Sequence, residues 1–153
     1  MSWRVHILPY MEEGALYDEF HLDEPWDSEH NIKLLNRMPP SYSHPDHPEL
    51  TTTTLFRAPD AEGSVLNANE KQTISTIEDG TSRTVLVLLV GAEKATPWTK
   101  PGGIEVDFDN VAKSLGVTEK QVSIMYGDLS VGSIDISIPA ENWRHLIHAA
   151  DGN

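Results

Sequence analysis

Residues 122–138, which read VSIMYGDLSVGSIDISI, carry the clearest structural signal in the sequence. Apolar side chains alternate at Val122, Ile124 and Tyr126, the pattern of a strand with one buried face. Gly127-Asp128 follows at once and suits a two-residue type II′ turn, which needs glycine at its first position. The pattern therefore predicts a β-hairpin in which this dipeptide has a structural role.

The same stretch predicts the register of the hairpin. Tyr126 would pair with Leu129, and Ile124 with Val131. Further on, the alternation changes phase, to Ile134, Ile136 and Ile138. A shift of phase by one residue requires an extra residue in the strand, so we expect a β-bulge at Gly132-Ser133.

Towards the N-terminus the sequence predicts two helices. The first runs from about residue 9 to residue 20, with Pro9 in its first turn, where a missing N–H costs nothing. The second begins at Asp27 or Ser28, both good N-caps, and ends at about residue 37, before Pro39-Pro40. The segment from there to residue 54 is rich in Pro, Ser and Thr and is expected to be an extended loop.

Three elements are predicted in the rest of the chain. Residues 83–90 form an apolar run rich in β-branched residues, typical of a central strand covered on both faces. Residues 111–115 suit a short helix ended by Gly116. The last helix runs from Pro139 or Ala140 to about residue 149. This order predicts an α+β fold with an antiparallel or mixed sheet, in a single domain over residues 1–153.

Composition excludes several classes of function. The 153 residues hold 11 Lys and Arg against 24 Asp and Glu, a net charge of −13. Such a surface repels nucleic-acid phosphates and anionic membranes, so we expect no nucleic-acid partner and no direct membrane contact by this chain. It would bind divalent cations loosely at most. The absence of cysteine excludes thiol catalysis and disulfides.

The last predicted helix carries one candidate metal site. Glu141, His145 and His148 are spaced i, i+4, i+7 and would share one helix face, as ligands of a divalent metal in a metal-dependent hydrolase. An apolar stripe on the opposite face would turn these ligands towards water. The stripe consists of Trp143, Leu146, Ile147 and Ala150. The sequence therefore gives no committed metal ligand, no cofactor and no catalytic residue, and it indicates a protein that is not an enzyme.

Three further motifs each have a functional and a structural interpretation. His44-x-x-His47 lies among prolines, which favours a solvated extended segment over a chelate. Residues 107–110 resemble the start of a calcium loop, but the glycine required at its sixth position is missing. Trp26 and Trp98, with the loops around them, are candidates for a carbohydrate- or peptide-binding platform. The simpler interpretation is that both anchor loops.

Four stretches together are distinctive. They are SWRVHILPYME (residues 2–12), HLDEPWDS (21–28) followed by His30-Asn31, DGTSRT (79–84) and PWTKP (97–101). In this order they resemble a large bacterial family of domains of unknown function. Members of that family typically begin with a prepilin-type cleavage and methylation segment, and some are named for an H-x9-DG signature.

The resemblance implies a pilin- or pseudopilin-like architecture. A long hydrophobic N-terminal helix, missing from this chain, would anchor the protein in the membrane, and the chain would be the globular head outside it. The implied role is structural or surface-interacting, through self-assembly or surface partners, with extracytoplasmic localisation. Nothing in the resemblance implies a catalytic residue.

This chain departs from the signature at two positions. Leu129 stands where the family has the Gly of its Asp-Gly pair, and Thr118 occupies the position of the His. We expect Gly127 to supply the positive φ one position earlier. The departure favours turn geometry, rather than chemistry, as the role of the motif.

Overall fold

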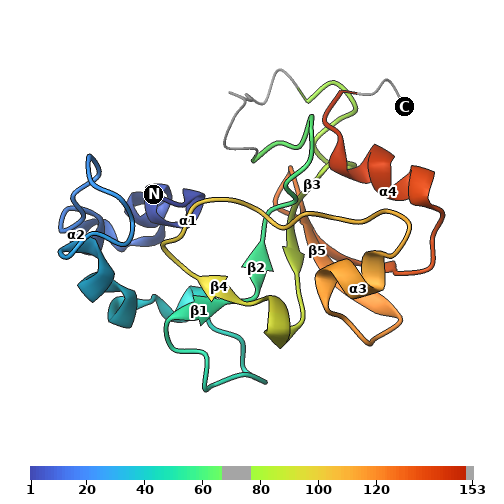
Figure 1. Cartoon of the computed structure of the whole chain (residues 1–153). Coiled ribbons are helices and arrows are strands. Elements are labelled where there is room, and N and C mark those ends of the chain that lie inside the picture. Colours follow the sequence, from blue (N-terminus) through green and yellow to red (C-terminus); the bar gives the residue numbers. More distant parts are fainter. Residues whose placement is uncertain (67–76, 151–153) are drawn as a thin grey trace. The chain divides into compact units, whose positions relative to one another are not determined.

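The computed structural model describes residues 1–66 and 77–150 (Figure 1). Helices and antiparallel strands both contribute, which confirms the predicted α+β class. The elements, in chain order, are α1 (Trp3–His6), η1 (Leu8–Met11), α2 (Gly14–Tyr17), η2 (Asn31–Arg37), η3 (Pro40–Tyr42), β1 (Thr53–Thr54), β2 (Phe56–Arg57), β3 (Val85–Leu89), η5 (Ala92–Lys94), β4 (Thr96–Pro97), α3 (Val111–Leu115), β5 (Gln121–Tyr126), β6 (Val131–Asp135) and α4 (Ala140–Ile147).

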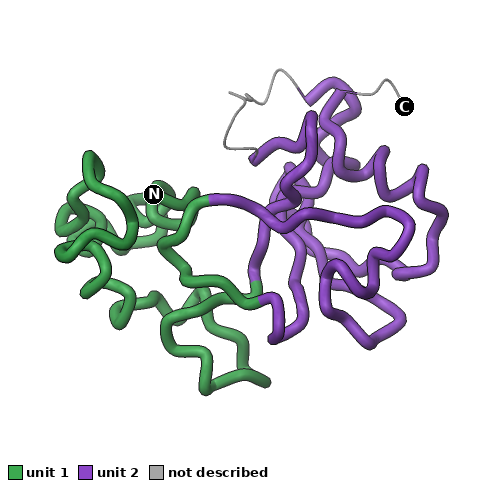
Figure 2. The backbone as a smooth tube through the Cα atoms, viewed as in Figure 1, with its two compact units in different colours: residues 1–55, 95–101 green, residues 56–94, 102–153 purple. Residues whose placement is uncertain are grey.

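The chain divides into two compact units, coloured separately in Figure 2. Unit 1 consists of residues 1–55 and 95–101, and unit 2 consists of residues 56–94 and 102–153. The single domain expected from the length of the chain stays a prediction. Each unit has buried apolar residues of its own and is described by itself.

Unit 1 is built around Trp98, which is fully buried. Phe20 meets its ring edge-on at 5.7 Å between centroids, and Tyr42 stacks on it at 5.9 Å. The indole N–H donates to the backbone carbonyl of Leu35 at 3.0 Å, so the polar atom of this large side chain is satisfied inside the core. The buried residues of the core are Val5, Leu8, Leu16, Phe20, Leu34, Tyr42 and Trp98.

The helices of unit 1 are shorter than predicted. The helix expected over residues 9–20 is replaced by η1 and α2, because Glu12 adopts a left-handed conformation (φ 63°) that a right-handed helix cannot pass. In the second region the predicted N-cap at Asp27 or Ser28 was wrong, since the helical element begins at Asn31 with His30 as its N-cap. Ser28 Oγ accepts from the N–H of Asn31 at 3.1 Å and so holds the turn before the helix. The element that follows is the 3₁₀ helix η2. The expected extended loop also contains η3 and the two-residue strand β1.

Unit 2 contains a four-stranded antiparallel sheet with the order β2-β3-β5-β6. The predicted central strand is confirmed, since β3 lies between β2 and β5. The helix α3 ends at Gly116, which has a φ of 65°, also as predicted. On α4, Trp143 and Ile147 are buried, but Ala150 is exposed because the helix ends at Ile147.

The hairpin of β5 and β6 is present, but the predicted register was wrong by one residue. Ile124 pairs with Gly132, and Met125 pairs with Val131. Val131 therefore faces away from the core. The register runs without a break from Val131 to Asp135, so the expected bulge at Gly132-Ser133 is absent. An irregularity in the sheet lies instead in β3, between Val85 and Val87.

The turn of the hairpin also differs from the type II′ turn expected. The N–H of Leu129 donates to the carbonyl of Tyr126 at 3.0 Å, and the N–H of Tyr126 donates to the carbonyl of Ser130 at 2.9 Å. Positive φ falls on Leu129 (68°) and not on Gly127. Three residues thus form the loop, a type I turn followed by one left-handed residue, where glycine is the usual choice.

Candidate functional site

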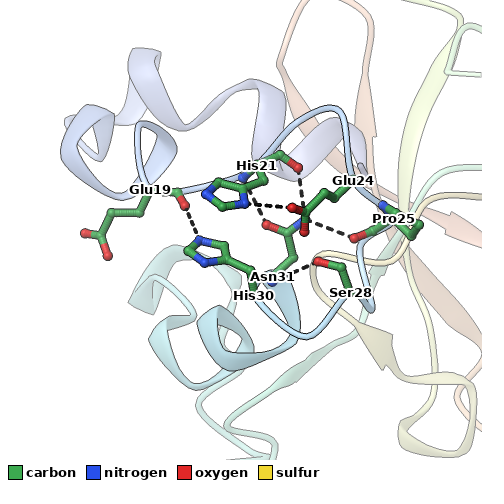
Figure 3. A network of polar contacts seen from close by, with 7 residues as sticks. All are labelled: Glu19, His21, Glu24, Pro25, Ser28, His30 and Asn31. Carbon is green, nitrogen blue, oxygen red and sulfur yellow. Dashed lines mark hydrogen bonds and ion pairs between the residues drawn. The ribbon is translucent and has the colours of Figure 1, made fainter.

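A network of polar contacts in unit 1 centres on Asn31, which is fully buried (Figure 3). Its side-chain oxygen accepts from the N–H of His21 at 3.0 Å. Its side-chain nitrogen donates to the carbonyls of His21 and Pro25, each at 2.9 Å. A buried amide without hydrogen-bond partners would lower the stability of the fold, so these bonds are needed. Through them Asn31 holds the loop over residues 21–31 in place.

Two histidines stack on the same network. The rings of His21 and His30 are nearly parallel (4°), with centroids 3.6 Å apart. His21 Nδ1 lies 2.9 Å from a carboxylate oxygen of Glu24, and His30 Nε2 lies 2.8 Å from the carbonyl oxygen of Glu19. These oxygens are acceptors, so each of the two ring nitrogens is the donor. Both imidazoles thus contribute a hydrogen bond that holds the chain in place.

Glu24 is the acid of this network. Hydrogen bonds from Ser28 and His21 lower the pKa of its carboxyl, because they stabilise the charged form. Both Glu24 and its partner His21 are substantially exposed, with side-chain accessibilities of 40% and 50%. The pair is therefore an exposed ion pair when His21 is protonated, and it supplies little stability.

Unit 2 contains a cavity of about 460 Å³ beside Arg57. The guanidinium of Arg57 donates to the carbonyl of Lys94 at 3.0 Å and to the carbonyl of Gly103. Its Nε is buried without a hydrogen-bond partner, and burial lowers the pKa of the side chain. Lys94 lines the cavity together with Glu105 and Asp107. Charges of both signs are present, so the lining selects neither an anion nor a cation, and Arg57 acts as a clamp between two backbone segments.

The turn of the β5–β6 hairpin is held by an aspartate. Asp128 Oδ1 accepts from the backbone N–H of Ser130 at 2.9 Å and from its hydroxyl at 2.6 Å. Asp135 makes the same pair of bonds with Ser137, at 2.8 Å and 2.6 Å. In both cases the serine hydrogen bonds lower the pKa of the aspartate. The side chain of Asp128 therefore holds the three-residue loop, in which it is the second residue.

Gly127 is required for a reason other than the predicted one. Its N–H donates to the carbonyl of Thr84 at 2.8 Å. A Cβ atom placed on it would lie 2.9 Å from the carbonyl oxygen of Thr81. The close approach of this second segment, rather than a positive φ, explains the glycine.

The predicted tryptophan platform does not form on Trp98. This residue is fully buried in unit 1, so its ring has no face open to a ligand. Trp26 is half-buried, and the amine of Lys100 lies 5.9 Å from the centroid of its ring. Trp98 anchors its loop to the core, which is the simpler of the two interpretations that the sequence allowed.

The structure does not bring Glu141, His145 and His148 together on one helix face. The helix ends at Ile147, and His148 follows in an extended conformation with its ring against Gly63. No group of three His, Asp or Glu side chains suited to a metal ion occurs anywhere in residues 1–66 and 77–150. In the His44-x-x-His47 motif, His47 Nδ1 lies 3.0 Å from a carboxylate oxygen of Glu49.

Sequence reasoning missed Asn31 and Arg57, which are both structural centres. Nothing in the local sequence distinguishes a buried asparagine or arginine from an exposed one. The left-handed conformation of Leu129 could have been predicted, since this residue follows Asp128 at the position where an Asp-Gly turn has its glycine.

Taken together, the chain is an α+β protein whose polar side chains mainly fasten loops and turns. A family model described as "Protein of unknown function (DUF1559)" matches residues 1–152, and the chain belongs to this family. No curated protein and no solved structure matches the chain. Within the part of the chain that the structure describes, no helix has the length and apolar character to cross a membrane.

Proposed function

We propose that this chain is the non-enzymatic, extracytoplasmic head of a pilin- or pseudopilin-like protein, with a structural or surface-interaction role. The observation that carries the proposal is what the polar side chains contact. His30, Asn31 and Arg57 donate to backbone carbonyls, and Asp128 and Asp135 accept from backbone N–H groups. Groups that could do acid–base chemistry thus serve to hold the chain.

The resemblance of residues 2–12 to a family whose members typically begin with a prepilin-type segment supports the anchored part of the proposal. Ser2 is buried, its hydroxyl donates to the carbonyl of Trp98 at 2.8 Å, and its N–H donates to the carbonyl of Thr99 at 3.1 Å. A membrane helix joined upstream of Ser2 would therefore be attached to a firmly held point of unit 1. Such a helix needs about 20 apolar residues.

Two measurements test this proposal. The first is the gene sequence upstream of Ser2, which we expect to encode the apolar helix. The second uses the absence of cysteine in the chain. A Tyr10→Cys variant of the full-length protein places a thiol at a site that is 88% exposed. We expect a membrane-impermeant maleimide to label it in intact cells.

The matched control is Ala58→Cys, since this residue is 1% exposed. It should react only after denaturation, which shows that labelling reports folded protein. The proposal would be contradicted by an open reading frame that encodes no apolar segment upstream of Ser2. It would also be contradicted if the Tyr10→Cys protein reacted only after cell lysis.

A further inference from the structure

The tip of the β5–β6 hairpin exposes two large apolar side chains. Leu129 is 68% exposed and Val131 is 77% exposed. Met125, the partner of Val131 across the hairpin, is half-buried on the same outer face. Further along the hairpin, away from the tip, this face is polar, and the hydroxyl of Ser133 donates to the side chain of Gln121 at 3.2 Å. On the hairpin the exposed apolar side chains are thus gathered at the tip, and Met125 lies opposite the buried Val87 of β3.

Leu129 is there at a cost to the fold. Its φ of 68° is a conformation that disfavours an L side chain by roughly 1–2 kcal/mol, and glycine would adopt it freely. The side chain gains nothing from the core in return, because it projects into solvent. A residue that costs stability twice, by strain and by apolar exposure, indicates selection for contact with something else.

The neighbouring strand offers the means of contact. Among the described residues β6 is the last strand of its sheet and pairs only with β5. Within residues 1–66 and 77–150 its outer edge therefore has no strand partner and is a place where an incoming strand could pair. Addition of a strand to such an edge combines main-chain hydrogen bonds with contacts to alternate side chains.

The negative charge around β6 indicates which kind of strand could pair with its edge. Asp128 lies in the turn before β6 and Asp135 is the last residue of the strand, and hydrogen bonds lower the pKa of both, so both are ionised at neutral pH. Lys120 is the cation that acts on Asp135. The chain as a whole carries a net charge of −13. A second copy of the chain would be repelled, whereas a basic segment would be attracted.

We propose that β6, with Leu129 and Val131, docks an extended segment of a partner protein in which apolar residues alternate with Lys or Arg. The inference rests on the surface-interaction part of the proposed function and is independent of membrane anchoring. The thiol-labelling experiment and the docking experiment can therefore fail independently of each other.

The test uses the folded chain and a synthetic peptide of alternating Lys and Val. We expect the peptide to shift the NMR signals of the β6 amides and to bind with measurable affinity. A peptide of alternating Glu and Val should not bind. A Lys/Val peptide N-methylated at every second residue keeps its charge but cannot add as a strand, so its affinity should fall at least about tenfold.

Two variants separate docking from folding. Val131→Thr keeps the shape and strand propensity of the side chain and should weaken binding at least about tenfold with little change in the thermal midpoint. Leu129→Gly should weaken binding by a similar factor and at the same time raise the thermal midpoint, because it removes strain. If Leu129 only stabilised the fold, its replacement would not weaken binding and raise the thermal midpoint at the same time. Tyr10→Ser, at an exposed aromatic in unit 1, is the matched control and should bind normally.

The proposal is overturned by any of four results. These are no binding at about 1 mM Lys/Val peptide, equal affinity of the N-methylated peptide, unchanged affinity in both hairpin variants, and β6 amide shifts that follow protein concentration instead of peptide. The last result would identify a second copy as the occupant.

Discussion

At the scale of single residues, Asn31 shows how one buried amide fixes a loop. It joins the backbone at His21 and Pro25 through three side-chain hydrogen bonds. An apolar residue of the same size would fill the same space but leave those backbone groups without partners. The stability of this part of unit 1 therefore depends on hydrogen bonding as well as on burial.

We predict that Asn31→Leu lowers the free energy of unfolding by about 1–3 kcal/mol, the cost of leaving buried polar groups unsatisfied. Urea denaturation followed by tryptophan fluorescence measures the effect, since Trp98 lies in the same unit. Asn36→Leu makes the same chemical change at an exposed position of η2 and should be nearly neutral. Equal losses in the two variants would contradict the assigned role.

Tyr42 gives a prediction about pH. Burial raises the pKa of its hydroxyl to about 12, and the hydroxyl donates to the carbonyl of Arg4 at 2.8 Å. The pKa in the unfolded chain is about 10, so the folded state favours the neutral form. This contribution to stability is complete below about pH 10 and is lost as the pH rises towards 12.

We therefore expect stability to fall between about pH 10 and pH 12, and Tyr42→Phe to remove most of that dependence. The variant also loses the bond to Arg4, so its stability at neutral pH should be lower by about 1 kcal/mol. Thermal midpoints across this range measure both effects. Tyr10→Phe, at a solvent-exposed tyrosine, should keep the alkaline loss of the parent chain, and an identical slope in Tyr42→Phe would refute the assignment.

At the scale of elements, the link between β3 and α3 depends on two glycines. The N–H of Gly91 donates to the carbonyl of Leu115 at 2.9 Å. A Cβ atom on Gly91 would lie 1.8 Å from the carbonyl oxygen of Gly116. Two backbone segments are therefore in direct contact, and no side chain fits between them.

We predict that Gly91→Ala lowers the free energy of unfolding by about 1–3 kcal/mol or more, because backbone must shift to admit the methyl group. Gly14→Ala is the matched control, since a Cβ atom there meets nothing within 4 Å. Gly14 begins α2, where alanine is favoured over glycine by up to about 1 kcal/mol. Denaturant unfolding of both variants checks the contrast, and a neutral Gly91→Ala would contradict it.

At the scale of the whole molecule, the excess of 24 acidic over 11 basic residues dominates. Like charges on the surface repel one another in the compact state, and salt screens this repulsion. We predict that raising the ionic strength from about 10 mM to about 150 mM increases the thermal midpoint by about 2–4 °C.

The salt prediction has an internal control. A variant that combines Asp18→Asn, Glu62→Gln and Glu119→Gln removes three exposed charges while nearly conserving shape. Its thermal midpoint should be higher at low salt and should respond less to added salt. An equal response in both proteins, or destabilisation by salt, would contradict the importance of net charge.

Features of the fold that depend on local sequence could be predicted. The central strand β3 and the end of α3 at Gly116 were predictable because each depends on local sequence, an apolar run in one case and a glycine stop in the other. A turn at Gly127-Asp128 was also predictable from local sequence, although its type and register were not.

Local sequence was enough to predict the α+β class, the hairpin and the acidic surface, since periodicity, turn residues and charge can be read from neighbouring positions. The left-handed conformations of Glu12 and Leu129 and the burial of Trp98 became evident only in the folded chain. Trp98 is buried against Phe20 and Tyr42, which lie far from it in the chain, and burial of these rings stabilises unit 1. Leu129 takes its position because the pairing of Met125 with Val131 sets the hairpin register and makes it the third residue of the loop.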